Sequence, residues 1–113
     1  PSAFKNCSLE ELDFSGSLRT IGADAFSLNK ELKVIIIPQG VTEIDNMAFQ
    51  NCSKLSRITL LSPTVHIGEH AFRYCDAIEV VYVNWGDEDI IRSKLPKAME
   101  GKVSYPYLPL TDI

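Results

Sequence analysis

Apolar residues recur along this chain with a period of 22 or 23 positions, and an Ala-Phe pair marks each period. A period of this length fits one short strand plus a return segment and is too short for a pair of helices. A single coil of this size cannot bury its own apolar face, so we expect the coils to stack on one another. The four pairs are Ala3-Phe4, Ala25-Phe26, Ala48-Phe49 and Ala71-Phe72.

The apolar positions after each pair predict the strands. Six, nine and eleven residues after Phe26 come Leu32, Ile35 and Ile37, and the next two copies repeat this spacing. The alternation and the β-branched side chains indicate a short strand with one buried face. We expect parallel strands in register near residues 11–14, 34–37, 57–60 and 80–83.

The positions before each pair predict the return segment. Ile21 and Ile67 are each followed by glycine, where a tight turn favours a residue without a Cβ atom, and Asp45 takes this place in the copy between them. The Ala-Phe pair is then expected to open one helical or 3₁₀ turn. These turns should lie near residues 3–7, 24–29, 47–52 and 70–75.

The period stops after Val83, which predicts coils over 1–83 (about four, the first incomplete) and a C-terminal cap over 84–113 in the same domain. The acidic residues 87–89 favour a helix start, and Pro96 should end that segment or start another short turn. Trp85 is expected to pack over the edge of the last coil, or else to form a binding platform. The acids of 86–89 lack the alternating spacing of a calcium loop.

Composition excludes some classes of function. The formal charge of −4 argues against nucleic acid, which requires a basic surface, and no apolar run is long enough to span a membrane. No signal peptide is present, but the chain begins in the middle of a coil, so we expect a fragment of a longer array. Its open N-terminal coil, with Phe4, Leu9 and Leu12, would then favour end-to-end self-association.

Three cysteines, Cys7, Cys52 and Cys75, each stand three residues after a repeat phenylalanine, and Asn29 fills the same place. Their spacing is that of the repeat and not that of metal ligands. We interpret them as buried structural thiols. A disulfide between Cys52 and Cys75 in adjacent coils is feasible but not expected, because it requires particular Cβ directions.

Residues 66–70 spell H-x-x-E-H, the motif of one class of zinc peptidases. A zinc-dependent hydrolase through His66, Glu69 and His70 is therefore a remote alternative. The repeat register opposes it, because Ile67 should point into the core and Gly68 should form a turn, whereas the motif needs a continuous helix. We assign no catalytic, cofactor-binding or metal-binding residue and expect no cofactor.

A binding surface is expected on the outward face of the parallel strands, whose residues alternate with the buried ones. Apolar residues on this face exceed what solubility requires, and such patches often mark interaction sites. Two alternatives stay open: β-propensity alone selected these residues, or the cap covers Tyr82. The candidate partner-binding residues are Val34, Ile36, Arg57, Thr59, Val80 and Tyr82.

The segment from Val41 to Leu60 resembles the repeat of the BspA-like leucine-rich repeat family, with the pattern V-x-x-I-x-x-x-A-F-x-x-C-x-x-L-x-x-I-x-L. Ile37-Pro38 adds the proline that commonly ends the strand there. The similarity covers about residues 3–83, with departures at Asn29 and Asp45. It implies an α/β leucine-rich-repeat solenoid, with short parallel strands on one face and short helical turns on the other.

The same resemblance implies extracellular or cell-surface proteins of host-associated bacteria and some parasitic protists, whose repeats serve adhesion. We therefore expect a non-catalytic protein-protein interaction module, a fragment of such a surface or secreted protein that binds a host or matrix protein. The alternative is a structural spacer or stalk that presents other domains. A carbohydrate-binding role lacks the exposed aromatic cluster that it normally uses.

Overall fold

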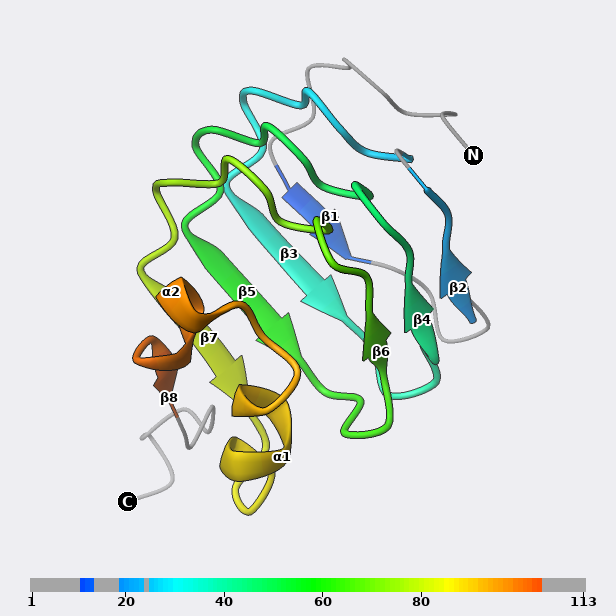
Figure 1. The fold of residues 1–113 in the computed structure, drawn as a ribbon, viewed down its shortest axis with the longest axis vertical. Coiled ribbons are helices and arrows are strands. Elements are labelled where there is room, and N and C mark those ends of the chain that lie inside the picture. The colour runs from blue at the N-terminus through cyan, green and yellow to red at the C-terminus, as the bar shows by residue number, and fades with distance from the viewer. Residues whose placement is uncertain (1–10, 14–18, 24, 105–113) are drawn as a thin grey trace.

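The computed structural model describes residues 11–13, 19–23 and 25–104. Two parallel sheets form its framework (Figure 1). The large sheet has the order β1-β3-β5-β7-β8, and the small sheet has the order β2-β4-β6. The large-sheet strands are β1 (Glu11–Asp13), β3 (Val34–Ile37), β5 (Arg57–Leu60), β7 (Val80–Val83) and β8 (Val103–Ser104), and the small-sheet strands are β2 (Thr20–Ile21), β4 (Glu43–Ile44) and β6 (His66–Ile67).

The predicted strands of the large sheet are confirmed, and so is their register. Ile35 lies opposite Ile58, and Ile58 lies opposite Val81, as the common spacing from each phenylalanine requires. These three side chains are fully buried. The inward face of the sheet is therefore built from the same repeat position in each copy.

The small sheet was not predicted. Its strands contain the isoleucines that precede each Ala-Phe pair, and Ile21, Ile44 and Ile67 are all buried. Two-residue strands carry too little alternation to be recognised as strands in a sequence. We call each stretch from a small-sheet strand to the next large-sheet strand a repeat unit, named by its phenylalanine: the Phe26 unit (20–37), the Phe49 unit (43–60) and the Phe72 unit (66–83).

The predicted helical turns are wrong in detail. Successive turns connect the two strands of each unit, with main-chain bonds such as that from the Cys52 N–H to the Phe49 carbonyl. Leu28, Asn51 and Tyr74, each two residues after a repeat phenylalanine, have positive φ angles of 63° to 65°. A residue in this left-handed region cannot continue a right-handed helix. The helices of the described residues lie elsewhere, in α1 (Glu88–Arg92) and α2 (Lys97–Glu100).

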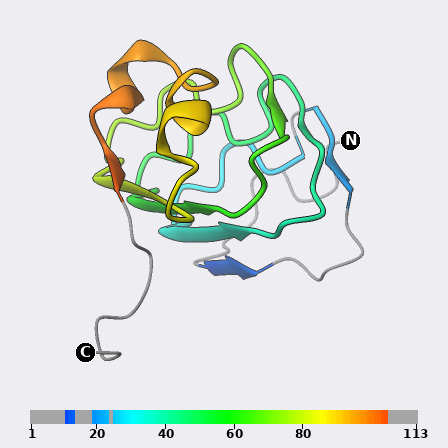
Figure 2. The same ribbon diagram turned by 90° about the horizontal axis from the view of Figure 1, so that it is seen from below.

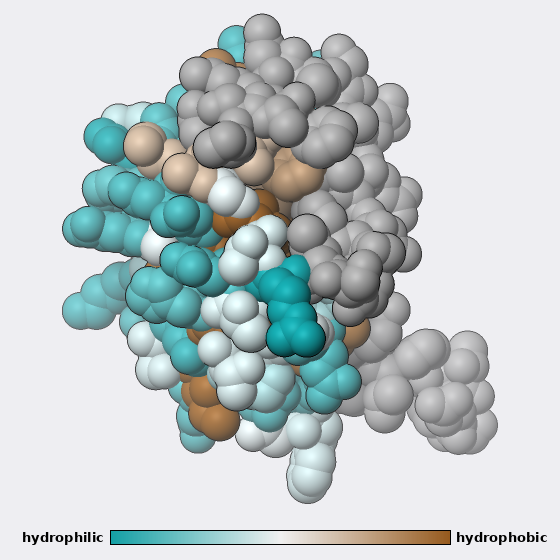
Figure 3. Space-filling model, turned by 90° about the vertical axis from the view of Figure 1, so that its right-hand side faces the viewer, coloured by the Kyte–Doolittle hydropathy of each residue, from teal (hydrophilic) through white to brown (hydrophobic). Residues whose placement is uncertain are grey.

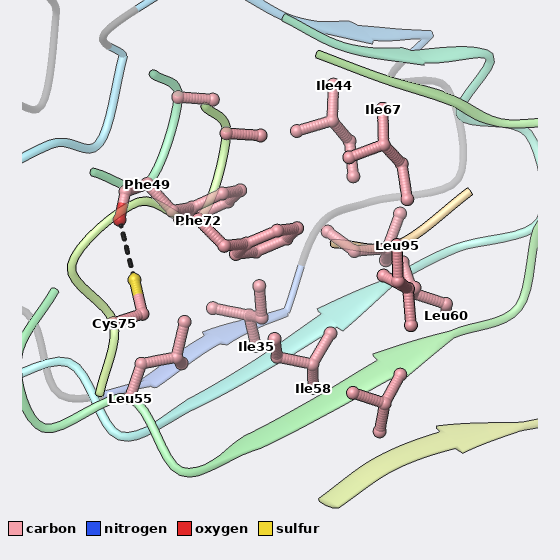
Figure 4. Close-up of a cluster of buried hydrophobic side chains, with 14 of the residues drawn as sticks. Ile35, Ile44, Phe49, Leu55, Ile58, Leu60, Ile67, Phe72, Cys75 and Leu95 are labelled. Atoms are coloured by element: carbon pink, nitrogen blue, oxygen red, sulfur yellow. Dashed lines mark hydrogen bonds between the residues drawn. The ribbon is translucent and has the colours of Figure 1, made fainter. Parts of the chain in front are cut away.

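The repeat phenylalanines form the centre of the core. The Phe49 ring stacks on Phe26 at a centroid distance of 5.4 Å and on Phe72 at 5.5 Å, with nearly parallel planes. Figure 4 shows Phe49 and Phe72 side by side between Ile44 and Ile67 on one side and Leu55 and Ile58 on the other. Identical rings one period apart therefore align as the units pack together.

Gly68 is required for close packing between units and not for an unusual turn angle, which corrects the reason inferred from the sequence. A Cβ atom at Gly68 would lie 2.5 Å from the main-chain nitrogen of Asn46 in the preceding unit. Real Cβ atoms do not approach a main-chain atom so closely. The glycine therefore lets β6 approach β4.

The segment after Val83 packs against the last repeat unit. Ile91, Leu95, Met99 and Val103 are buried with the core, and β8 extends the large sheet beside β7. Figures 1 and 2 show α1 and α2 at this end of the molecule, away from β2. Trp85 is 75% exposed, so the prediction that it packs over the edge of the last unit is wrong.

Candidate functional site

The predicted partner-binding residues gather on one face of the large sheet. The register places Arg57 between Val34 and Val80, and it places Thr59 between Ile36 and Tyr82. These are the two columns expected from the sequence. A hollow of about 170 Å³ lies on this face, and its lining consists of Val34, Ile36, Arg57, Thr59 and Tyr82. Val80 lies in the same column as Arg57 but does not line the hollow.

Exposure on this strand face is uneven. Val34, Ile36, Val80 and Tyr82 are half-buried, and Arg57 is exposed. Thr59 is only 5% exposed, contrary to the expectation that its side chain is accessible to a partner. It lies on the central strand, and its register neighbours on either side are the larger residues Ile36 and Tyr82. Thr59 therefore forms the floor of the hollow.

Arg57 is the one charged residue among the six. Its side chain forms no ion pair with any residue within the described ranges. A guanidinium carries five N–H donors in a rigid fork and is well suited to a carboxylate or to main-chain carbonyls of a partner. The strand face thus combines half-buried apolar side chains around a buried threonine with one cation.

The side of the molecule that carries the small sheet has a different surface. Figure 3 views the side that carries the small sheet, where the described residues are mostly hydrophilic, with separate apolar spots between them. Polar surfaces of this kind are ordinary for a protein in water. The strand face is therefore the better candidate of these two surfaces.

The cysteines of the described ranges are structural. Cys52 and Cys75 are both free and buried. The Cys75 thiol donates a hydrogen bond to the Phe49 carbonyl at 3.1 Å, and the Cys52 thiol donates one to the Phe26 carbonyl at 3.4 Å (Figure 4 draws the first). A hydrogen bond with the Cys52 side chain and burial raise the pKa of the Cys75 thiol. The same hydrogen bond lowers the pKa of the Cys52 thiol. The Cys75 thiol, held protonated, is a poor nucleophile and a poor metal ligand. Cys7 lies outside the described residues.

The H-x-x-E-H segment does not form the helix that its motif requires. His66 and Ile67 form β6, and the chain then turns at Gly68, so His66 and His70 do not share a helical face. The main-chain N–H of His70 donates to the Asn46 side chain at 2.8 Å. Within the described ranges, no group of three or more histidine, cysteine, aspartate or glutamate side chains is placed to hold a metal ion.

The acids of 86–89 make local contacts. Glu88 Oε1 accepts the Gly86 N–H at 2.6 Å, and Asp89 pairs with Arg92 at 3.1 Å in the manner of an i,i+3 helix pair. These contacts fit the predicted helix start, which α1 confirms.

A second hollow, of about 270 Å³, was not predicted from the sequence. It lies between the turns of the Phe72 unit and α2, and its lining includes His70, Phe72, Tyr74, Ala98 and Met99. The repeat pattern treated this region as one more copy of the turns. No local signal in the sequence marks it, because it arises where the repeat meets a segment that does not continue it.

The comparisons with known proteins place the repeat in a family. The model of the BspA-type leucine-rich repeat region, which describes six copies, matches residues 1–93. None of the curated proteins and none of the solved structures matches the chain significantly. Within the described ranges, neither helix has the length and apolar character needed to cross a bilayer.

Proposed function

Because this chain belongs to the BspA-type leucine-rich repeat family, we propose that it is a non-catalytic module that binds another protein through the strand face of its large sheet. The observation that carries this proposal is the hollow lined by Val34, Ile36, Arg57, Thr59 and Tyr82. Proteins of this family generally mediate protein interactions. The parallel strands hold the hollow on a rigid framework, which lowers the entropic cost of binding.

The chemistry of this face supports a protein ligand. Half-buried Val34, Ile36 and Tyr82 offer apolar area, and tyrosine and arginine are the side chains that often dominate binding energy at protein interfaces. A partner with an apolar side chain for the hollow and an acceptor near Arg57 would complement it. This combination is typical of an interface with an apolar centre and a polar rim.

The wider setting belongs to the same proposal. We place the chain in a leucine-rich-repeat solenoid of an extracellular or cell-surface adhesion protein, with residues 84–113 ending the repeat region of 1–83. The partner would then be a host or matrix protein. End-to-end association through the N-terminal coil remains a prediction, since residues 1–10 lie outside the described ranges.

The test is a comparison of charge substitutions on and off the strand face. Ile36→Asp and Tyr82→Asp place carboxylates at the hollow, whereas Ile90→Asp changes an exposed residue of α1 and serves as the matched control. Binding to immobilised extracellular-matrix proteins is measured by surface plasmon resonance, and circular dichroism checks the fold. We expect at least about a tenfold loss of affinity for the two face variants, the size of a moderate interface residue.

Equal affinities of the three variants, with the fold intact, would contradict the proposed site. If no matrix protein binds and all variants behave alike, the spacer alternative explains the chain better. That outcome would assign the repeats a role in presenting other domains.

A further inference from the structure

Main-chain hydrogen bonds between consecutive repeat units follow one rule in the turns. In the Phe26 and Phe49 units, the N–H of the repeat phenylalanine and the N–H two residues later donate forward to carbonyls of the next unit. Phe26 donates to Ala48 and Leu28 to Gln50, both at 2.8 Å; Phe49 donates to Ala71 and Asn51 to Arg73, also at 2.8 Å. Each unit thus offers two donors to the unit that follows it.

The Phe72 unit offers the same two donors, but the segment after it does not repeat. The N–H groups of Phe72 and Tyr74 have no hydrogen-bond partner among residues 11–13, 19–23 and 25–104. The α2 segment lines the hollow beside them, and the carbonyls of its own turn are bonded within it: Pro96 accepts from Met99 at 2.9 Å, and Met99 accepts from Lys102 at 3.0 Å. The α2 segment therefore covers apolar side chains but does not continue this series of forward main-chain hydrogen bonds, which we call the ladder.

The carbonyl of Phe72 is the third incomplete group. In the two preceding units, this carbonyl accepts a thiol of the next unit, Cys52 for Phe26 and Cys75 for Phe49. The Phe72 carbonyl accepts the Cys75 N–H of its own unit at 3.2 Å and no forward donor within the described ranges. Two donors and one acceptor consequently point forward from the Phe72 unit.

The 270 Å³ hollow lies at this place. Phe72 and Tyr74 line it from one side, and Pro96, Ala98 and Met99 line it from α2. One water takes about 30 Å³ of liquid volume, so the hollow is larger than a single hydration site. Tyr74 is 51% exposed, and its hydroxyl accepts a hydrogen bond from Arg73 at 2.8 Å at the rim.

We propose that this hollow binds an extended or turn segment of another protein, which completes the ladder in place of a further repeat unit. The expected ligand carries the same groups with which each repeat unit contacts the unit before it. It presents two main-chain carbonyls two residues apart, as Ala48 and Gln50 do. It carries a small apolar side chain at the first of these positions and a small donor such as cysteine or serine four residues after it, as at Cys52.

The mixture of groups favours a peptide over a free anion. An anion would accept from Phe72 and Tyr74 but would be repelled by the Phe72 carbonyl, and the lining also contains the acids Glu69 and Asp76. The Arg73 guanidinium lies over the Tyr74 ring at 4.6 Å and bonds its hydroxyl. Addition of a segment to open main-chain groups is an established mode of peptide recognition. This site is separate from the strand face and does not depend on the function proposed above.

Amide hydrogen exchange of the unmodified chain tests the premise. Tyr74 and Asn51 occupy the same repeat position with nearly the same φ, but only the Asn51 N–H is bonded within the described residues. We expect the Tyr74 amide to exchange at least about tenfold faster than that of Asn51, and Phe72 faster than Phe49. Equal protection within both pairs would overturn the proposal.

Binding is tested with a peptide that copies the chain itself. The probe is an acetylated and amidated peptide with the sequence of residues 46–53, in which serine replaces Cys52. We expect it to shift the amide resonances of Phe72 and Tyr74 and to slow their exchange. Ala98→Trp should abolish both effects by filling the hollow, whereas Lys97→Trp, on the same helix but outside the lining, should keep them.

Several results would overturn the proposal. Peptide-induced shifts that survive in Ala98→Trp would place binding elsewhere, and the absence of any shift at Phe72 and Tyr74 would remove the site. Stronger shifts with inorganic phosphate or acetate than with the peptide would make it an anion site. Shifts that depend on the concentration of the chain alone would identify a second copy as the occupant. If Ala98→Trp does not fold, the exchange measurements on the unmodified chain still decide.

Discussion

The Phe49 unit and the Phe72 unit have nearly the same pattern of residues but different surroundings. The Phe49 unit lies between two other units, and its Ile44, Phe49 and Cys52 are fully buried. In the Phe72 unit, which meets a non-repeating segment, Ile67, Phe72 and Cys75 are 9%, 5% and 8% exposed. Equivalent positions thus differ because burial in a repeat protein is supplied by the neighbouring units.

The same difference appears in the polar groups. The forward donors of the Phe49 unit find carbonyls in the next unit, whereas those of the Phe72 unit have no acceptor among the described residues and belong to residues that line a hollow. These main-chain donors find their acceptors only where another repeat unit follows. Ends are therefore where a repeat protein carries open hydrogen-bonding capacity.

The largest expected effect comes from removing the central ring. Phe49 stacks on both Phe26 and Phe72, whereas Phe72 stacks on Phe49 alone among the described rings. Phe49→Ala should lower the free energy of unfolding by about 3–5 kcal/mol, and Phe72→Ala should cost less, since its site lies beside an open hollow. Urea denaturation of both variants measures this. Equal losses would show that the end unit is packed as well as the interior one.

Gly68→Ala tests the close approach of the Phe72 unit to the Phe49 unit. The added Cβ atom would meet main-chain atoms of Asn46, so we expect a loss of about 1–3 kcal/mol. Gly101→Ala is the control, because a Cβ atom there meets nothing within 4 Å. Thermal denaturation compares the two. Similar melting temperatures for both variants would argue that the units can separate without cost.

The third prediction concerns the dependence of stability on pH. The pKa of Cys75 is raised in the folded chain above its ordinary value of 9.0, so the unfolded chain loses this proton first. Above about pH 9, the free energy of unfolding should therefore fall by up to about 1.4 kcal/mol per pH unit from this group.

Cys75→Ala should remove that part of the slope. The measurement is urea denaturation of both proteins between about pH 8 and pH 10, a range chosen about the ordinary thiol pKa. Parallel pH profiles would mean that the thiol ionises equally in both states.

The smallest effect is expected for the ion pair between interior units. Lys54 of the Phe49 unit bonds Glu31 of the Phe26 unit at 3.1 Å, with both side chains about half exposed, and the equivalent place in the Phe72 unit is Ala77. Lys54→Ala should change the free energy of unfolding by only about 0.2–1 kcal/mol. Urea denaturation at low and high salt measures this change. A larger loss of unfolding free energy that does not depend on salt would indicate packing of the aliphatic part of the lysine side chain.

The large sheet was predictable because its strands are long enough to show alternation. Val34–Ile37 and Val80–Val83 each alternate between buried and half-buried residues, and the common period sets their register. The strands of the small sheet were not predicted, because they are too short to show alternation. Ile44 and Ile67 were recognised as core positions, but two residues do not distinguish a strand from a turn.

The candidate strand face was predicted as a set of columns, and the structure places all six residues on it. Their exposure was not predictable, since the burial of Thr59 depends on what packs beside the central strand and not on its place in the repeat. Trp85 was also misplaced: a large apolar side chain usually packs, but its position is decided by the path of residues 84–87, for which the repeat provides no template.

The repeat, the family, the inward and outward positions of the large sheet and the burial of Cys52 and Cys75 all follow from the order of amino acids. They follow because a constant period places equivalent side chains at equivalent sites, whatever the exact path of the turns. Only the tertiary structure revealed the second sheet, the left-handed turn residues, the strand-face hollow and the main-chain groups of the Phe72 unit that lack a forward partner among the described residues. These features depend on how one unit meets another or meets a segment without the repeat, and that meeting is a property of the packed chain.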